Sequence, residues 1–319
     1  MSTTRAGSRR AGLVLAGVAA VISGVAVFVN SYGLKAVGDA TVYTTGKNLV
    51  SAVALLVVVA AVARSASAPV LQRPTTRAHW LGLAVVGTFG GCVAFVLFFE
   101  GLARSSSVHA AFLQKTLVVW VALLAVPLLK ERVGALQAGA IVLLVVGQAM
   151  SGESLGEVQD SVVATLQMPF GKGEALVLAA ALIWSVEVVV AKRLLADLSS
   201  WTVALTRMVM GSVLLVGWVT VKGDLHQLVS LDAVQWRWVL VTGAILAAYV
   251  STWFAALARA QAVDVTAVLV AAAIITALLN TLWKHQPIGP QLTGLAVVAL
   301  GAAVVAAGAL MRDRQAVPA

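Results

Sequence analysis

The sequence predicts an all-α integral membrane protein of ten transmembrane helices, arranged as two inverted five-helix repeats with both termini cytoplasmic. Three observations predict this fold class: an apolar composition, a repeat of half the chain length and an uneven placement of basic residues. Hydrophobic residues make up 61% of the 319 and charged residues only 11%, at a mean hydropathy of +0.97. Because so few charges cannot cover the surface of a soluble domain, most of the exterior faces lipid.

A helix that spans a bilayer needs roughly 17–25 apolar residues. Stretches of about this length lie at 11–34, 40–63, 79–99, 108–129, 133–150, 173–191, 201–221, 236–258, 263–283 and 289–310. The first follows three arginines and resembles a signal peptide, but further spans follow at once without a convincing cleavage site, so we interpret it as a retained helix.

The longest polar connection divides the ten spans into two sets of five. The predicted organisation is a cytoplasmic tail at 1–10, a first repeat at 11–150, an extracytoplasmic connecting loop at 151–172, a second repeat at 173–310 and a cytoplasmic tail at 311–319.

The two halves match without a gap at an offset of 155 residues from the end of the third span onward. Gly-Leu-Ala-Arg at 101–104 aligns with Ala-Leu-Ala-Arg at 256–259. The match continues through Gly139 with Gly294 to Val142 with Val297. Five spans per half is an odd number, so the second half lies inverted relative to the first. An inverted half-length repeat in so apolar a chain is typical of secondary transporters.

The basic residues outside the spans test this topology. With both termini inside, thirteen lysines and arginines fall on the cytoplasmic side and six on the outer side, where the connecting loop carries Glu153, Glu157 and Asp160. This distribution satisfies the positive-inside rule. The net charge of +9 is therefore interpreted as a topology signal in a multi-pass protein of the cell (plasma or inner) membrane, whose partner is the lipid bilayer and not nucleic acid.

A set of weak motifs carries a family resemblance. The sixth span contains Trp184 and ends at Lys192, the seventh carries Arg207 early, and Lys130-Glu131-Arg132 forms a turn after the fourth span. Together with the ten inverted spans, this set resembles the EamA-type branch of the drug/metabolite transporter superfamily over 11–150 and 173–310. The chain departs from the pattern at Val27, where the first half lacks the tryptophan, and at Gln286, where the second half lacks the acid.

The resemblance implies a secondary active transporter, an exporter of a small organic metabolite such as an amino acid, a related zwitterion or anion, or a drug-like compound. It implies alternating access at the interface of the inverted halves and no enzymatic activity. A flippase for a lipid-linked substrate shares the fold family and stays an alternative. A polytopic membrane enzyme is a second alternative, although the longest loop lacks the histidines or arginines that such a site needs.

Charged residues inside the spans are costly and therefore mark candidate sites. Glu187 and Arg207 lie in the inner half of the bilayer, and their repeat counterparts Asn30 and Lys47 lie in the outer half. A gate or substrate contact is one interpretation, and a structural salt bridge or a snorkelling arginine is the other. Glu187 is also the proton-coupling candidate, because a partly desolvated carboxylate can exchange protons near neutral pH.

The fourth span carries the clearest difference between the halves. His109, Gln114 and Lys115 stand where the ninth span has Asp264, Leu269 and Val270, in that order. Lys115 lies about 10 Å into the membrane at ~1.5 Å per residue, so it faces protein or water. The neighbours expected at that depth are Lys47, Asn48, His109 and Glu100.

Such a basic site favours a carboxylate, phosphate or other anionic or zwitterionic substrate, whereas the alternative is a bridge from Lys115 to Glu100 or Glu187. The candidate substrate-binding or gating residues are thus Asn30, Lys47, Asn48, His109, Gln114, Lys115, Glu187 and Arg207.

Catalytic, metal and cofactor sites are not expected. The four histidines are scattered without an i, i+4 pair, and Cys92 is the one cysteine. Gly46-Lys47-Asn48 lacks the upstream glycine and the terminal Ser or Thr of a phosphate-binding loop. Glycines at heptad spacing in the last span (Gly294, Gly301, Gly308) indicate close helix packing, with a homodimer contact as the alternative.

Overall fold

The computed structural model describes residues 2–105, 107–150, 170–285 and 292–315, and this part of the chain is helical with no strand. It contains nine helical segments that are long and apolar enough to cross a membrane, and a shorter apolar helix at Ala135–Met150 takes the place of the fifth expected span. The predicted all-α membrane fold is confirmed. Most of the connecting loop at 151–172, and Gln286, lie outside the described residues.

The first half consists of α1 (Ser2–Val37), α2 (Ala40–Ser65), α3 (Arg77–Val85), the π-helix η1 (Val86–Val93), α4 (Ala94–Leu102), α5 (Ser107–Lys115), α6 (Leu117–Leu129) and α7 (Ala135–Met150). The second half consists of α9 (Lys172–Leu194), α10 (Ser200–Lys222), the short α11 (Leu225–Val229), α12 (Ala233–Arg259), α13 (Ala262–Leu269), α14 (Ala272–Lys284) and α15 (Leu292–Gln315).

The fourth and ninth spans are each broken near the middle, at positions 155 residues apart. In the ninth, the N–H groups of Val270 and Ala271 donate to carbonyls three residues back, a tighter turn than the α-helix. Each of these spans also ends at a left-handed residue, Lys130 (φ 55°) and His285 (φ 53°). The prediction of unbroken helices at 108–129 and 263–283 is therefore wrong. The paired breaks nevertheless confirm that the two halves are repeats.

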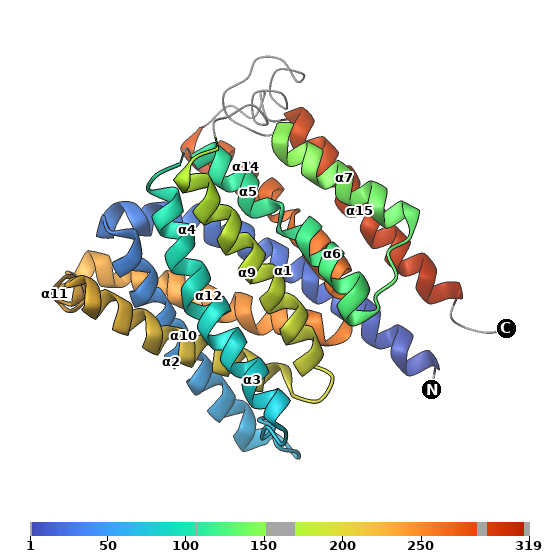
Figure 1. The fold of residues 1–319 in the computed structure, drawn as a ribbon, viewed down its shortest axis with the longest axis horizontal. Helices are drawn as coiled ribbons and strands as arrows, with labels where there is room; N and C mark the ends of the chain where they lie inside the picture. Colours follow the sequence, from blue (N-terminus) through green and yellow to red (C-terminus); the bar gives the residue numbers. More distant parts are fainter. Residues whose placement is uncertain (1, 106, 151–169, 286–291, 316–319) are drawn as a thin grey trace.

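The helices assemble into two four-helix bundles, each drawn from both halves. In the first bundle α1 packs on α12, α13 and α14, and in the second bundle α9 packs on α4, α5 and α6. Because α9 is the repeat of α1, these are the same set of contacts formed twice. The pairs α2 with α10 and α7 with α15 lie beside the bundles, and α7 and α15 run side by side in Figure 1.

Both chain ends lie on the same side of the molecule (Figure 1). We call this side the terminal end and the other side the opposite end. The end of α6, the start of α7, the end of α9 and the connection from α12 to α13 belong to the terminal end. The terminal end is the one expected to face the cytoplasm.

Glycines bring two helix pairs, each with one member from either half, into close contact. A Cβ added at Gly91 of η1 would lie 2.7 Å from the carbonyl oxygen of Arg207 on α10. A Cβ added at Gly243 of α12 would lie 2.9 Å from the carbonyl oxygen of Lys47 on α2. Lys47 and Arg207, which the repeat alignment pairs, thus each lie where a glycine of a neighbouring helix allows close approach.

Candidate functional site

A cavity of about 280 Å³ lies between the two bundles and is lined by residues of both halves. Its volume is near the lower end of the range for small-molecule sites, and its wall has the usual character of such sites, mostly apolar with a few convergent polar groups. The polar and charged lining residues are Ser23, Asn30, Lys47, Gln114, Lys115, Glu187, Arg207, Thr242 and Thr266.

Glu187 and Arg207 form a buried ion pair at this cavity. The Nε of Arg207 donates to one carboxylate oxygen of Glu187, and Nη2 lies 3.4 Å from the other. Both side chains are almost wholly buried. The ring of Phe95 lies 5.7 Å from the guanidinium carbon and covers it further. The salt-bridge interpretation therefore describes the contact correctly, and the pair also lines the cavity.

The π-helix η1 supplies a backbone oxygen to this centre. The N–H of Ala94 donates to Phe89, five residues back, and not to Gly90. The carbonyl of Gly90 instead accepts from the indole N–H of Trp184 and from Nη2 of Arg207, each at 3.2 Å.

Position 90 has no room for a side chain, since an added Cβ would lie 2.2 Å from a carboxylate oxygen of Glu187. The span predicted at 79–99 is thus not a regular helix, and the role of Gly90 is not among the predicted ones. The adjacent glycines at 90 and 91 are the signal in the sequence that points to it.

Two ammonium groups face the same cavity from the first half. Lys47 is buried, with Nζ 5.2 Å from the ring centre of Tyr43, and the hydroxyl of Tyr43 donates to Asn30 at 2.7 Å. Lys115 stands at the last residue of α5, beside the break in the fourth span. Within the described part of the chain, neither Lys47 nor Lys115 forms an ion pair.

The alternative interpretation, a bridge from Lys115 to Glu100 or Glu187, is therefore not supported among the described residues. Glu100 lies away from the cavity and pairs with Arg104 at 2.5 Å on its own helix and with Lys222 at 3.0 Å. Its expected place beside Lys115 is wrong, whereas the intrahelical Glu100–Arg104 pair is present as the i, i+4 spacing suggests.

Six of the eight candidate residues line the cavity: Asn30, Lys47, Gln114, Lys115, Glu187 and Arg207. Asn48 does not, because its amide donates to the carbonyl of Thr44 at 2.8 Å on its own helix. The side chain of His109 lies outside the described part of the structure.

Five aromatic side chains complete the wall: Phe95, Trp184, Tyr249, Trp253 and Phe254. Phe95 meets Trp184 edge to face at 5.3 Å between ring centres, and Tyr249 stacks on Trp253 at 6.1 Å. Among the described residues no group of three or more His, Cys, Asp or Glu could hold a metal ion.

The described part of the chain thus forms nine apolar spans and one shorter apolar helix, in two repeats around a central cavity, which is the architecture of a multi-pass membrane protein. Residues 10–152 and 171–307 match the model of the EamA-like transporter family, and the chain belongs to that family. The resemblance inferred from the motifs is thereby confirmed.

Two further similarities agree with this assignment. "Uncharacterized transporter sll1164" of Synechocystis sp. (strain ATCC 27184 / PCC 6803 / Kazusa) is 25% identical over 238 residues, which are 72% of this chain and 66% of that protein. A solved structure described only as "Crystal structure of protein" superposes with a TM-score of 0.73 at 17% identity, covering 94% of this chain and 98% of the other. The latter similarity concerns the fold alone.

Proposed function

We propose that this transporter exports a small anionic or zwitterionic organic metabolite across the plasma or inner membrane, with the central cavity as its substrate site. The observation that carries the proposal is the pair of ammonium groups, Lys47 and Lys115, that face the cavity without a carboxylate partner among the described residues. A buried charge without a partner is unfavourable, so an anionic group of the substrate gains a charge-assisted contact on binding.

The rest of the wall favours an organic body on that anion. The rings of Phe95, Trp184, Tyr249 and Trp253 offer an apolar surface for it. Glu187 stands at the same cavity and provides a carboxylate for the amino group of a zwitterion. Amino acids and related or drug-like carboxylates combine these features.

The arrangement of two equivalent bundles around one site supports alternating access as the mechanism. The cavity lies beside the breaks in the fourth and ninth spans, where Lys115 and Val270 occupy equivalent positions. Rocking one bundle against the other exposes the site to each side of the membrane in turn. The termini face the cytoplasm in this proposal.

Proton exchange at Glu187 couples export to the proton gradient. The carboxylate gains a proton on one side, which weakens its pairing with Arg207, and loses it on the other. In reconstituted vesicles, the Glu187→Gln variant is expected to transport at a rate independent of an imposed pH gradient, while the wild type responds to the gradient. An unchanged response in Glu187→Gln would remove this carboxylate from the coupling step.

Metabolite profiling identifies the substrate and tests its class. Medium from cells that overexpress the protein is expected to gain a small carboxylate or zwitterion that medium from deleted cells lacks. Efflux of that compound from proteoliposomes should fall at least about tenfold in Lys115→Val, in line with the loss of a charged hydrogen bond of roughly 1.5–3 kcal/mol.

The matched control is Lys172→Ala, which removes an exposed lysine at the start of α9 and should leave efflux intact. Altered lipid-linked pools with no change in small molecules would instead support the flippase alternative.

A further inference from the structure

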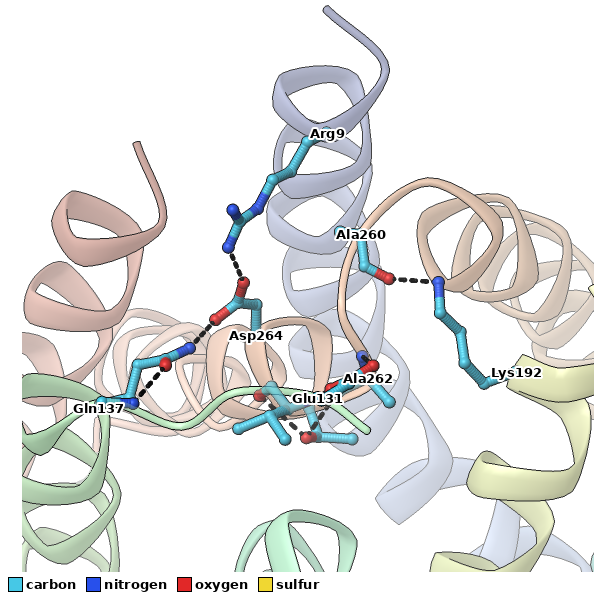
Figure 2. Close-up of polar contacts among 10 residues, drawn as sticks. Arg9, Glu131, Gln137, Lys192, Ala260, Ala262 and Asp264 are labelled. Carbon is cyan, nitrogen blue, oxygen red and sulfur yellow. Dashed lines mark hydrogen bonds and ion pairs between the residues drawn. The ribbon is translucent and has the colours of Figure 1, made fainter. Parts of the chain in front are cut away.

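The terminal end holds a second polar cluster, shown in Figure 2, whose members do not line the cavity. Its centre is Asp264 in the first turn of α13, which is fully buried. Arg9 of α1 donates to one of its carboxylate oxygens at 2.7 Å, and the amide of Gln137 on α7 donates to the other at 2.5 Å. Asp264 therefore ties α7 to the first bundle.

Glu131 joins the two bundles directly. It follows α6 of the second bundle, and its carboxylate accepts the backbone N–H groups of Ala262 at 2.7 Å and Val263 at 3.2 Å, at the start of α13 of the first bundle. A helix start offers unsatisfied N–H groups and a positive dipole end, so a carboxylate there is favourable. Burial raises the pKa of Glu131 above its ordinary value, although the two N–H groups oppose this effect.

Lys192 makes a second link between the bundles. Near the end of α9, its ammonium donates to the carbonyl of Leu257 at 2.5 Å and to that of Ala260 at 2.6 Å, where α12 ends. Figure 2 shows Lys192 reaching Ala260 from one side while Glu131 meets Ala262 from the other. The connection from α12 to α13 is thus held at both of its ends by residues of the second bundle.

The opposite end lacks equivalent links among the described residues. Lys35 is the repeat counterpart of Lys192, but it is exposed and makes no hydrogen bond in the described part of the chain. The helix α13 packs on α6 and α9, and no comparable packing of α5 on α14 or α1 occurs among the described residues.

The sequences of the two halves explain part of this difference. Each acidic or amide residue of the cluster has a residue of another type as its repeat counterpart in the other half. The pairs are Glu131 with Gln286, Asp264 with His109 and Gln137 with Leu292.

We propose that Glu131 and Lys192, supported by the Asp264–Gln137 contact, form a latch that holds the terminal end closed. The inference rests on the proposed alternating access. It assigns these residues a gating role apart from the substrate cavity. Opening the terminal end requires that the latch contacts between the bundles break, whereas contacts within each bundle persist.

Accessibility of a cavity residue tests the latch without knowledge of the substrate. Thr266 of α13 lines the cavity near the terminal end, so Thr266→Cys in a Cys92→Ala background serves as the reporter. A membrane-impermeant maleimide is applied to vesicles on the side where a terminal tag is protease-sensitive. We expect slow labelling in the parent and at least about tenfold faster labelling in Glu131→Ala.

Glu100→Gln is the matched control, because it removes a carboxylate at the opposite end, and it should label as slowly as the parent. Unchanged labelling in a monodisperse, folded Glu131→Ala protein would overturn the proposal.

Cross-linking supplies a second, independent test. Glu131→Cys with Val263→Cys spans the two bundles, and a short bis-thiosulfonate linker should stop transport until a reductant is added. Ser31→Cys with Lys284→Cys lies within the first bundle, where the ammonium of Lys284 donates to the hydroxyl of Ser31 at 2.9 Å, and the same linker should leave transport intact.

The latch proposal would be overturned if the protein linked between positions 131 and 263 still transported at the full rate. It would also be overturned if the linker failed to join the two cysteines. If instead the unlinked variants and the wild type carry no carboxylate or zwitterion, the proposed function fails, while the labelling result still decides the latch.

Discussion

The two ends of this molecule are built from one repeated unit, yet they are held together in different ways. At the terminal end Glu131, which is buried, and Lys192, which is half-buried, bind backbone groups of the other bundle, and the buried Asp264 ties α7 to the first bundle. At the opposite end the contacts of Glu100 with Lys222 and of Lys284 with Ser31 are exposed to solvent, and the buried Glu174 accepts from Ser105 within the second bundle. An inverted repeat provides two equivalent arrangements, and side chains that differ between the halves decide which one is populated.

The largest expected effect comes from removing the buried acid at the terminal end. Asp264→Ala leaves Arg9 and Gln137 without their common acceptor, which should destabilise the protein by roughly 3–5 kcal/mol, as for other broken buried ion pairs. Glu100→Ala at the opposite end should cost less than about 1 kcal/mol, because its partners are exposed. Thermal unfolding in detergent measures both, and equal shifts in Tm would remove the distinction between the two ends.

An intermediate effect is expected from the two repeat-related lysines. Lys192→Ala removes two hydrogen bonds across the bundles and should speed labelling of the Thr266→Cys reporter from the terminal side about tenfold, equivalent to ~1.4 kcal/mol. Lys35→Ala changes an exposed side chain and should leave that rate as it is. Similar rates in the two variants would show that the lysines contribute alike to closure and would contradict the comparison.

The smallest expected effect is a pH dependence of terminal-end closure. Burial raises the pKa of Glu131 in the closed arrangement, where Lys192 of α9 and Asp264 of α13 are the charged groups that act on it. On opening, water returns the pKa toward its ordinary value of 4.5, so the closed form binds the proton more tightly. The resulting stabilisation of the closed form is complete when the pH is below that ordinary value. It is lost as the pH rises through the raised pKa.

Labelling of the reporter from the terminal side should therefore slow a few-fold as the pH falls through this window, after correction for the intrinsic pH dependence of the maleimide reaction with a free thiol. Glu131→Gln cannot titrate but keeps an oxygen that accepts a hydrogen bond, so its corrected rate should stay constant with pH. A pH dependence that persists in Glu131→Gln would assign the effect to another group.

Most of the candidate site could be predicted because charges inside a membrane span are rare and costly. That rule by itself brought Lys47, Lys115, Glu187 and Arg207 together, and all four line the cavity. It misplaced Asn48, since an amide in a buried helix can satisfy itself on the carbonyl four residues back. It also missed Gly90, because a π-helical carbonyl leaves only a faint trace in the sequence.

The sequence by itself determined the membrane-spanning helices, the repeat and its inversion, because hydropathy, a constant offset and an odd number of spans per half are properties of the chain alone. The tertiary structure decided which helices of the two halves share a bundle and which residues meet across them. Glu131 is visible in the sequence only as part of a basic turn. Its place at the start of α13, 131 residues away, depends on how two short helices pack, and no local pattern records that contact.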